Sequence, residues 1–213
     1  MSPTRAVTAL KVVLWIAALA PGAWLAGGIV RGWLGANPAE TLTHVTGMAT
    51  LVLLLVTLAV TPVRRLTGWN PVIRLRRPLG LFAFAYAFTH FTIWFAFYNV
   101  FDVGRMIADV AERPYITVGF TAFLILIPLA VTSTKGWIRR LGKRWNTVHQ
   151  GIYVAAMLGV VHFYWLVKAD TRLPILLGVC LLVLLALRVR APKVDRAGRA
   201  ETQPSLSGPS QAG

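Results

Sequence analysis

The 213-residue chain is 56% hydrophobic and only 14% charged, and its mean hydropathy is +0.64. A soluble domain carries about a quarter charged residues, so this composition excludes a large water-facing surface and indicates a membrane protein. The net charge of +15 does not indicate nucleic-acid binding, because the basic residues lie at the ends of apolar runs. The single cysteine, Cys180, belongs to no disulfide or zinc-binding pattern.

Six apolar stretches approach the roughly 20 residues that a membrane-spanning helix requires. They cover about residues 10–30, 44–62, 79–101, 115–133, 148–167 and 173–189. The apolar length of the first stretch favours a retained helix over a cleaved signal peptide. The sequence therefore predicts an all-α membrane protein built as a bundle of six transmembrane helices.

Positive charge is distributed unevenly between the two sides that six spans define. Of the 22 Lys and Arg residues, 17 lie in segments on the side of the N-terminus: Arg5, Lys11, Arg64, Arg65, Arg74, Arg76, Arg77, Lys135, Arg139, Arg140, Lys143, Arg144, Arg188, Arg190, Lys193, Arg196 and Arg199. The opposite side holds five of the seven acidic residues: Glu40, Asp102, Asp109, Glu112 and Asp170. By the positive-inside rule, both termini are predicted to lie in the cytoplasm, with the chain in the bacterial inner membrane.

Three regions are expected along the chain. Residues 1–9 form a cytoplasmic N-terminus, and residues 10–189 form one transmembrane domain without an evident internal repeat. Residues 190–213 are rich in Pro, Gly, Ser and Ala, which predicts a disordered cytoplasmic tail. No Gly-x-Gly-x-x-Gly motif announces a dinucleotide site, so the chain is not expected to oxidise NAD(P)H by itself.

All four histidines, His44, His90, His149 and His162, lie within or at the ends of predicted spans. Ionisable groups at membrane depth are costly and by default mark ion paths or cofactor ligands. Neutral imidazole is a common axial ligand of haem iron, whereas zinc ligands are usually close in sequence. A single histidine could simply bond a neighbouring helix, but three on two adjacent spans, without membrane-depth carboxylates, favour haem binding.

The spacing of these residues predicts two levels. His149 and His162 are 13 residues apart, about 20 Å along a helix, and Arg77 lies 13 residues before His90. We expect a cytoplasmic level with His149 and Arg77, and a deeper level where His90 and His162 clamp a b-type haem. Two stacked redox centres would carry an electron across hydrocarbon about 30 Å thick. Thirteen residues leave a net rotation of about 220° on a straight helix, so either this helix is distorted or its two histidines meet different neighbours.

Other features have both a functional and an ordinary explanation. Arg77 would pair with a haem propionate, although arginines at a span end also serve topology and anionic lipid. His44 either ligates or supports the deeper site, or lies in the interfacial zone. Gly159 and Ala87, each three residues before a histidine, would admit a flat porphyrin or allow close helix packing. Residues 101–115 are expected to form an interfacial helix that docks a periplasmic partner.

Five motifs occur in one order: VTPVRRLTG (60–68), RRPLGLFAFAYAFTHF (76–91), RPYITVGF (113–120), TSTKGWIRRLGKRWNTVHQGIY (132–153) and HFYWLVKAD (162–170). Together they resemble the family of haem-binding membrane subunits (MsrQ) of the bacterial periplasmic methionine-sulfoxide reductase system. That family belongs to the ferric-reductase-like transmembrane group. The resemblance covers residues from about 8 to 190.

The resemblance implies a transmembrane electron-transfer subunit that binds one or two b-type haems and has no substrate-reducing site of its own. It implies FMN as well, although no residue here matches a flavin-binding motif. Electrons would come from the quinone pool or a cytosolic flavin reductase. They would pass to a periplasmic molybdopterin-containing reductase that repairs methionine sulfoxide in proteins. The family's haem ligands fall on His90, His149 and His162.

Departures from the ferric reductases and rival functions also follow from the sequence. The chain lacks the second histidine of the third span and the FAD/NAD(P)H domain, which argues against a self-contained ferric reductase. A quinone-linked cytochrome b for another periplasmic acceptor is one alternative. A cofactor-free transporter or proton channel is another, and it predicts a colourless protein. A structural anchor predicts that histidine substitutions are silent.

Overall fold

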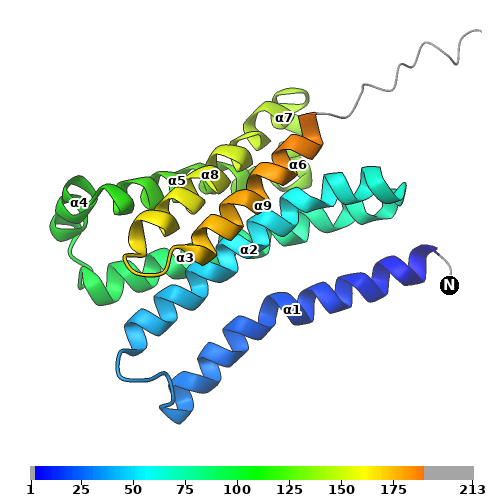
Figure 1. The fold of residues 1–213 in the computed structure, drawn as a ribbon. Coiled ribbons are helices and arrows are strands. Elements are labelled where there is room, and N and C mark those ends of the chain that lie inside the picture. The colour runs from blue at the N-terminus through cyan, green and yellow to red at the C-terminus, as the bar shows by residue number, and fades with distance from the viewer. Residues whose placement is uncertain (1–2, 190–213) are drawn as a thin grey trace, which may run out of the picture.

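The computed structural model describes residues 3–189, and the regular structure within them is entirely helical (Figure 1). The long helices are α1 (Pro3–Arg31), α2 (Pro38–Thr67), α3 (Arg76–Ile93), α5 (Pro114–Val131), α8 (Gly151–Leu166) and α9 (Arg172–Val189). The short elements are a 3₁₀ turn (Asn70–Leu75), a π-helical turn (Trp94–Tyr98), α4 (Val103–Glu112), α6 (Lys135–Leu141) and α7 (Arg144–His149). The tail predicted at 190–213 lies outside the described residues.

Four helical segments are long and apolar enough to cross a membrane: Thr8–Arg31, Pro38–Thr67, Asn70–Tyr98 and Pro114–Val131. The other two predicted spans correspond to α8 and α9. Helix α8 has 16 residues but follows α7 after the single residue Gln150, and α9 carries an arginine near each end. The helical, multi-pass character is therefore confirmed, while six spans with cytoplasmic termini stay a prediction.

Local sequence signals set the ends of several helices. Asn37 caps α2, because its side chain accepts a hydrogen bond from the Glu40 N–H at 3.3 Å, and Pro38 occupies the first helical position. The same helix ends at Gly68, whose φ of 67° is the left-handed conformation that favours glycine. Asp102 caps α4 by accepting from the Arg105 N–H at 3.1 Å.

The core is formed where two helix pairs meet. Helix α2 packs against α3 and is here called the first pair, whereas α5 packs against α8 and forms the second pair. Side chains at the centre of the core are at most 5% exposed and include Leu54, Leu58, Ala83, Leu126 and Ala155. Because alanines lie at this contact, the helix backbones approach one another closely.

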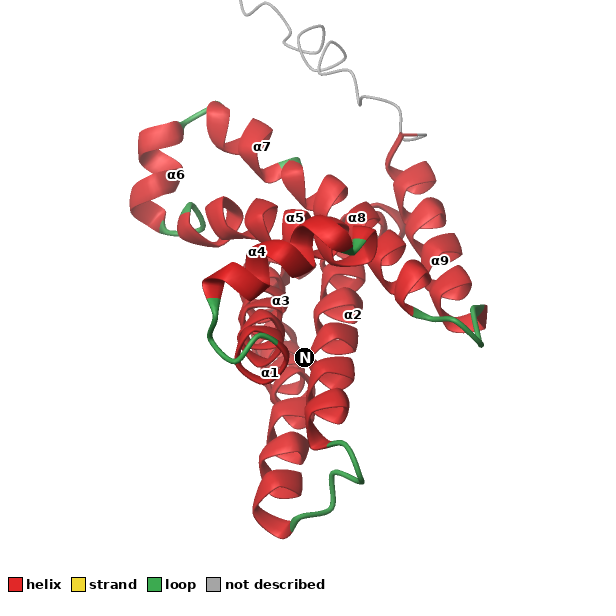
Figure 2. Ribbon diagram, turned by 90° about the vertical axis from the view of Figure 1, so that its left-hand side faces the viewer, coloured by secondary structure: helices red, strands yellow, loops and turns green. Residues whose placement is uncertain are grey.

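Two short regions lie at opposite ends of the bundle. Helices α6 and α7 lie toward the end of the bundle opposite α4 (Figure 1). Figure 2 looks onto the other end and shows α4 running across it. A helix is thus present within residues 101–115, and it packs against α5.

Helix α1 runs along the outside of the bundle (Figure 1). It contacts the bundle through apolar side chains, including Trp15 on Phe82, and through the hydroxyl of Tyr86. The Tyr86 hydroxyl donates to the Ala18 carbonyl at 2.6 Å and accepts from the Gly22 N–H at 3.0 Å. In a regular helix those two backbone groups would bond each other. Pro21, which lies between them, lacks an N–H and weakens the helix at this point.

Candidate functional site

His90 of α3 and His162 of α8 face each other across the two helix pairs. Their ring centroids are 6.2 Å apart and their ring planes are at 86°. Neither histidine has an acidic partner, because the three ion pairs within residues 3–189 all join aspartates to arginines elsewhere. The structure thus brings together the two histidines that the sequence placed at the deeper level.

Each of these rings is held by a backbone carbonyl. Nδ1 of His90 lies 2.9 Å from the Thr43 carbonyl oxygen, and Nδ1 of His162 lies 2.7 Å from that of Tyr115. A carbonyl can only accept, so Nδ1 carries the hydrogen in both rings. The lone pair then resides on Nε2, which is the arrangement that metal-ligating histidines adopt.

A glycine lies against each ring. A Cβ on Gly47 would come within 3.0 Å of the His90 ring, and a Cβ on Gly119 would come within 2.6 Å of Nδ1 of His162. Real Cβ atoms essentially never approach another atom as closely as the second of these contacts. The histidines therefore occupy space that exists because two helix positions carry no side chain.

The two helix pairs are versions of one arrangement. Each feature of the first pair recurs 72 positions later in the second pair. The carbonyl of residue 43 corresponds to that of residue 115, Gly47 corresponds to Gly119, and His90 corresponds to His162. The same offset relates the core residues Leu54 to Leu126 and Ala83 to Ala155. The expectation of no internal repeat is therefore wrong. The two copies of the repeat share a backbone carbonyl, a position without a side chain and small core residues. These features produce little sequence identity between the copies.

A cavity of about 660 Å³ adjoins the pair. His44 and Asp170 are the other ionisable residues in its wall, and Gly159 contributes to it from α8. The wall is otherwise mainly apolar, with Met48, Leu51, Val52, Phe163 and Leu166. The opening expected at Gly159 is present, whereas Ala87 is buried in the core, where it allows close packing.

The ligand geometry fits haem better than a bare metal ion. Within residues 3–189, no group of three His, Cys, Asp or Glu side chains is placed to hold an ion. A structural zinc site needs four such ligands and a catalytic one three. Two opposed imidazoles suit a metal that brings its own equatorial ligands, as haem iron does. An apolar cavity beside them is the environment that a porphyrin requires.

His149 lies apart from this pair. Its Nε2 is 3.1 Å from the Thr132 hydroxyl, and its ring stacks on Trp145 with centroids 3.9 Å apart. The Thr132 hydroxyl donates to the Pro128 carbonyl, so it accepts from Nε2 of His149. This nitrogen is therefore engaged, unlike its counterparts in His90 and His162.

The surroundings of His149 explain the 13-residue spacing. Helix α7 ends at His149 and α8 begins after Gln150, so the chain is interrupted between the two histidines and each meets different neighbours. The positive charge that acts on His149 is that of Arg76. The Arg77 side chain is exposed, although the offset of 72 positions makes Arg77 the counterpart of His149.

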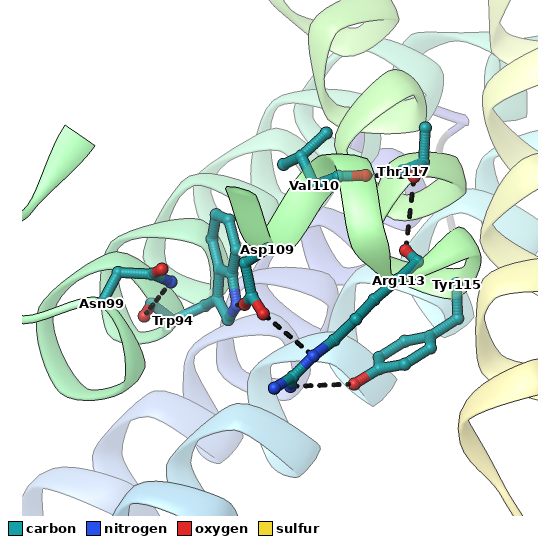
Figure 3. Close-up of polar contacts among 7 residues, drawn as sticks. All are labelled: Trp94, Asn99, Asp109, Val110, Arg113, Tyr115 and Thr117. Atoms are coloured by element: carbon teal, nitrogen blue, oxygen red, sulfur yellow. Dashed lines mark hydrogen bonds and ion pairs between the residues drawn. The ribbon is translucent and has the colours of Figure 1, made fainter. Parts of the chain in front are cut away.

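Sequence reasoning missed a polar network at the α4 end of the bundle (Figure 3). Asp109 accepts a hydrogen bond from Nε1 of Trp94 at 3.2 Å and pairs with Nε of Arg113 at 3.0 Å. The Arg113 guanidinium reaches the Tyr115 hydroxyl at 3.5 Å. Tyr115 is also the residue whose carbonyl holds His162. Counting charges on each side of the membrane could not reveal these contacts, because Asp109 and Arg113 simply cancel in the net charge.

Comparison with known proteins identifies relatives along most of the chain. Residues 46–160 match the family described as ferric reductase like transmembrane component. The chain is 52% identical over 186 residues to the protein-methionine-sulfoxide reductase heme-binding subunit MsrQ of Herminiimonas arsenicoxydans, covering 86% of this chain and 85% of that protein. It is 48% identical to the MsrQ subunit of Bordetella pertussis, covering 88% of this chain and 92% of that protein.

A third relative, the MsrQ subunit of Rhodospirillum rubrum, is 46% identical over 192 residues, which is 89% of this chain and 92% of that protein. No solved structure matches the chain significantly. The resemblance inferred from the five motifs is thus confirmed. The chain belongs to the MsrQ family, within the ferric-reductase-like transmembrane proteins.

Proposed function

We propose that this chain is the haem-binding, electron-transferring membrane subunit of a protein-methionine-sulfoxide reductase. The observation that carries the proposal is the His90–His162 pair, with ring centroids 6.2 Å apart. A metal–imidazole bond is about 2 Å long, so two rings on opposite faces of one metal have centres roughly 6 Å apart. The relatives, which are named as heme-binding subunits, support the same conclusion.

A b-type haem bound at this site would supply one-electron redox chemistry. His90 and His162 would hold the iron through Nε2 from either face, because the Thr43 and Tyr115 carbonyls keep both Nδ1 hydrogens engaged. Those carbonyls also fix the orientation of each ring and raise its basicity. The cavity wall is mainly apolar, which would limit the access of water to the haem, and His44 in the same wall would be a polar partner for it.

The proposal extends to the direction of transfer. With six spans and cytoplasmic termini in a bacterial inner membrane, His149 lies at the cytoplasmic level and is proposed as a ligand there, with Arg77 as a propionate partner. Electrons come from the quinone pool or a cytosolic flavin reductase, with FMN proposed from the family resemblance alone. They pass to a periplasmic molybdopterin-containing subunit that reduces methionine sulfoxide in proteins.

The first experiment is absorption spectroscopy of the purified protein, oxidised and then dithionite-reduced, with pyridine extraction to type and count the haem. We expect sharp b-type bands from low-spin iron. His90→Ala and His162→Ala should each abolish the low-spin signal of the deeper site, since either change removes one axial ligand. His149→Ala should leave that signal in place, and it should lower the haem count only if a second haem is bound at the cytoplasmic level.

Two outcomes would contradict the proposal. A colourless protein, after expression with ample haem supply, would favour a cofactor-free transporter or proton channel. Retention of the full low-spin signal in both His90→Ala and His162→Ala would place the haem elsewhere.

The partner is tested separately. Co-purification from the membrane should recover a molybdenum-containing reductase, and the reduced wild-type protein should be reoxidised on mixing with that reductase. Recovery of a different periplasmic acceptor would instead identify a quinone-linked cytochrome b. The donor is tested by adding either a quinol, or NADH with a flavin reductase, to the oxidised protein. The addition that produces the reduced bands identifies the electron donor.

A further inference from the structure

The two histidines lie on different helix pairs, so their separation depends on how the pairs are held together. Aromatic stacking contributes at this level, since Phe91 of α3 lies over Phe123 of α5 with centroids 4.7 Å apart and planes at 11°. Stacked rings slide against one another at little cost, because the attraction depends weakly on lateral offset. A directional contact is needed to fix the position of one pair along the other.

Asp109 provides such a contact. Its Oδ2 accepts from Nε1 of Trp94 at 3.2 Å, and its Oδ1 pairs with Nε of Arg113 at 3.0 Å (Figure 3). The Trp94–Asp109 bond joins the turn that continues α3 directly to α4. A second polar link between the pairs runs through Arg188 of α9, which donates to the Leu58 carbonyl of α2 and to the Tyr153 hydroxyl of α8. The Asp109 side chain is 17% exposed, whereas that of Arg113 is 56% exposed, so the ion pair lies at the surface and contributes little by itself.

Asp109 is connected to each histidine through a short series of hydrogen bonds and neighbouring residues. On one side, Trp94 begins the π-helical turn, and its backbone N–H donates to the His90 carbonyl. On the other side, Arg113 caps α5 and reaches the Tyr115 hydroxyl, while the Tyr115 carbonyl accepts from His162. The hydroxyl of Tyr115 and the carboxylate of Asp109 raise the pKa of Arg113, so this guanidinium remains charged at physiological pH.

We propose that Asp109 is a positioning residue that fixes the distance and angle between His90 and His162, and thereby the ligand field of the haem. This inference rests on the proposed function, because it concerns the same paired site. Asp109 touches neither histidine. It acts through Trp94 on the helix that carries His90, and through Arg113 and Tyr115 on the carbonyl that orients His162.

The experiment compares Asp109→Ala with Glu112→Gln in the full-length, haem-loaded protein. Glu112 is the matched control, because it is an exposed acid on the same helix. Three properties are measured: the electron paramagnetic resonance g values of the ferric protein, the midpoint potential, and the rate of haem loss to an apomyoglobin scavenger. The g values depend on the angle between the two imidazole planes, which a loss of general stability does not change.

For Asp109→Ala, we expect altered g values, a shifted midpoint potential and a rate of haem loss about tenfold faster, which is the low end of the effect seen when a group that orients a metal-ligating histidine is removed. Glu112→Gln should match the wild type in all three properties. Trp94→Phe removes the same hydrogen bond from the other partner and keeps an aromatic ring. It should reproduce the direction of the Asp109→Ala changes, and it tests the inference even if Asp109→Ala fails to fold.

The double variant adds a check on the bond itself. If Trp94 and Asp109 act through their contact, the effects of the two substitutions on haem loss should be less than additive. Wild-type g values and potential in both single variants would overturn the positioning role while leaving the haem proposal intact. A wild-type protein without low-spin haem would instead overturn the proposed function.

Discussion

At the scale of single residues, the histidine pair depends on positions where a side chain is missing. The contact between Gly119 and His162 is the tightest one, because a Cβ would lie 2.6 Å from Nδ1 and 2.8 Å from Cε1. Gly47 is more permissive, with a Cβ at 3.0 Å from the His90 ring. A methyl group at position 119 therefore forces either the ring or helix α5 to move.

Gly119→Ala should weaken the low-spin signal and lower the free energy of unfolding by about 1–3 kcal/mol, the usual cost of overpacking. Gly80→Ala is the control, since Gly80 lies in helix α3 and no atom lies within 4 Å of its added Cβ. That change should raise stability by about 0.5–1 kcal/mol, because alanine restricts the unfolded chain. Absorption spectra and thermal unfolding in detergent measure both effects, and equal behaviour of the two variants would contradict the steric explanation.

Val100 and Phe101 hold backbone strain close to the site. Their φ angles are 51° and 57°, in the left-handed region that costs a non-glycine residue roughly 1–2 kcal/mol. Val100 is 65% exposed, so its side chain offers little packing in return. These two residues follow the π-helical turn that continues the His90 helix.

Val100→Gly should therefore raise the unfolding free energy by about 1 kcal/mol. Val103→Gly is the comparison, because Val103 is similarly exposed but helical, and there glycine should cost about 0.5 kcal/mol. Thermal unfolding of the two variants should shift in opposite directions. Destabilisation by both would show that residue 100 is not strained in the protein.

At the scale of elements, α1 is held to the bundle by apolar contacts and by the Tyr86 hydroxyl, which bridges Ala18 and Gly22. Tyr86→Phe leaves these backbone groups without that partner beside Pro21, and in an apolar setting this should cost about 1–3 kcal/mol. Tyr98→Phe is the control, because Tyr98 is 49% exposed. Thermal unfolding and limited proteolysis of α1 provide the measurement. An unchanged melting temperature for Tyr86→Phe would mean that α1 closes its own hydrogen bond and is held by apolar contacts.

The elements differ in how well the sequence predicts them. Hydropathy located the long helices, because the solvent for a spanning segment is hydrocarbon along its whole length. The break at Gln150 is marked only by the adjacent Gly151 and by the rotation between His149 and His162, and a single glycine within an apolar run does not by itself predict a helix end. A helix within residues 101–115 was predicted from its mixed charge, and α4 is that helix. The pair Asp109–Arg113 has the i,i+4 spacing of a helical ion pair, whereas the bond from Trp94 to Asp109 depends on a tertiary contact that no local pattern encodes.

At the scale of the whole molecule, the orientation in the membrane is the main prediction that the fold leaves to experiment. In a Cys180→Ser background, Arg105→Cys and Lys135→Cys place single thiols at exposed positions on opposite ends of the bundle. A membrane-impermeant maleimide added to intact cells should label the residue at 105 and not the one at 135. The reverse pattern would invert the proposed topology, and labelling after cell lysis controls for access.

The sequence predicted which histidines belong to the candidate site, but it did not predict the groups that hold them in place. The motifs and the 13-residue intervals identified His90 and His162, because imidazoles are rare at membrane depth and stand out. The Thr43 and Tyr115 carbonyls could not be found in this way, since every residue has a carbonyl. The repeat at 72 positions would have revealed them, because it aligns each carbonyl, glycine and histidine with a counterpart.

The separation between His149 and the His90–His162 pair has a consequence for the energetics of the cell. At the rise of a continuous helix, the 13 residues from His149 to His162 would span about 20 Å, so with the interruption at Gln150 this interval is at most roughly two-thirds of the hydrocarbon thickness. A full crossing of the membrane is worth about 2.3 kcal/mol per charge for each 100 mV, so this interval is worth at most about 1.5 kcal/mol. With the proposed orientation and an interior that is electrically negative, an electron moving outward is driven by the membrane voltage. Repair of periplasmic proteins would then draw on the energised state of the membrane as well as on the donor.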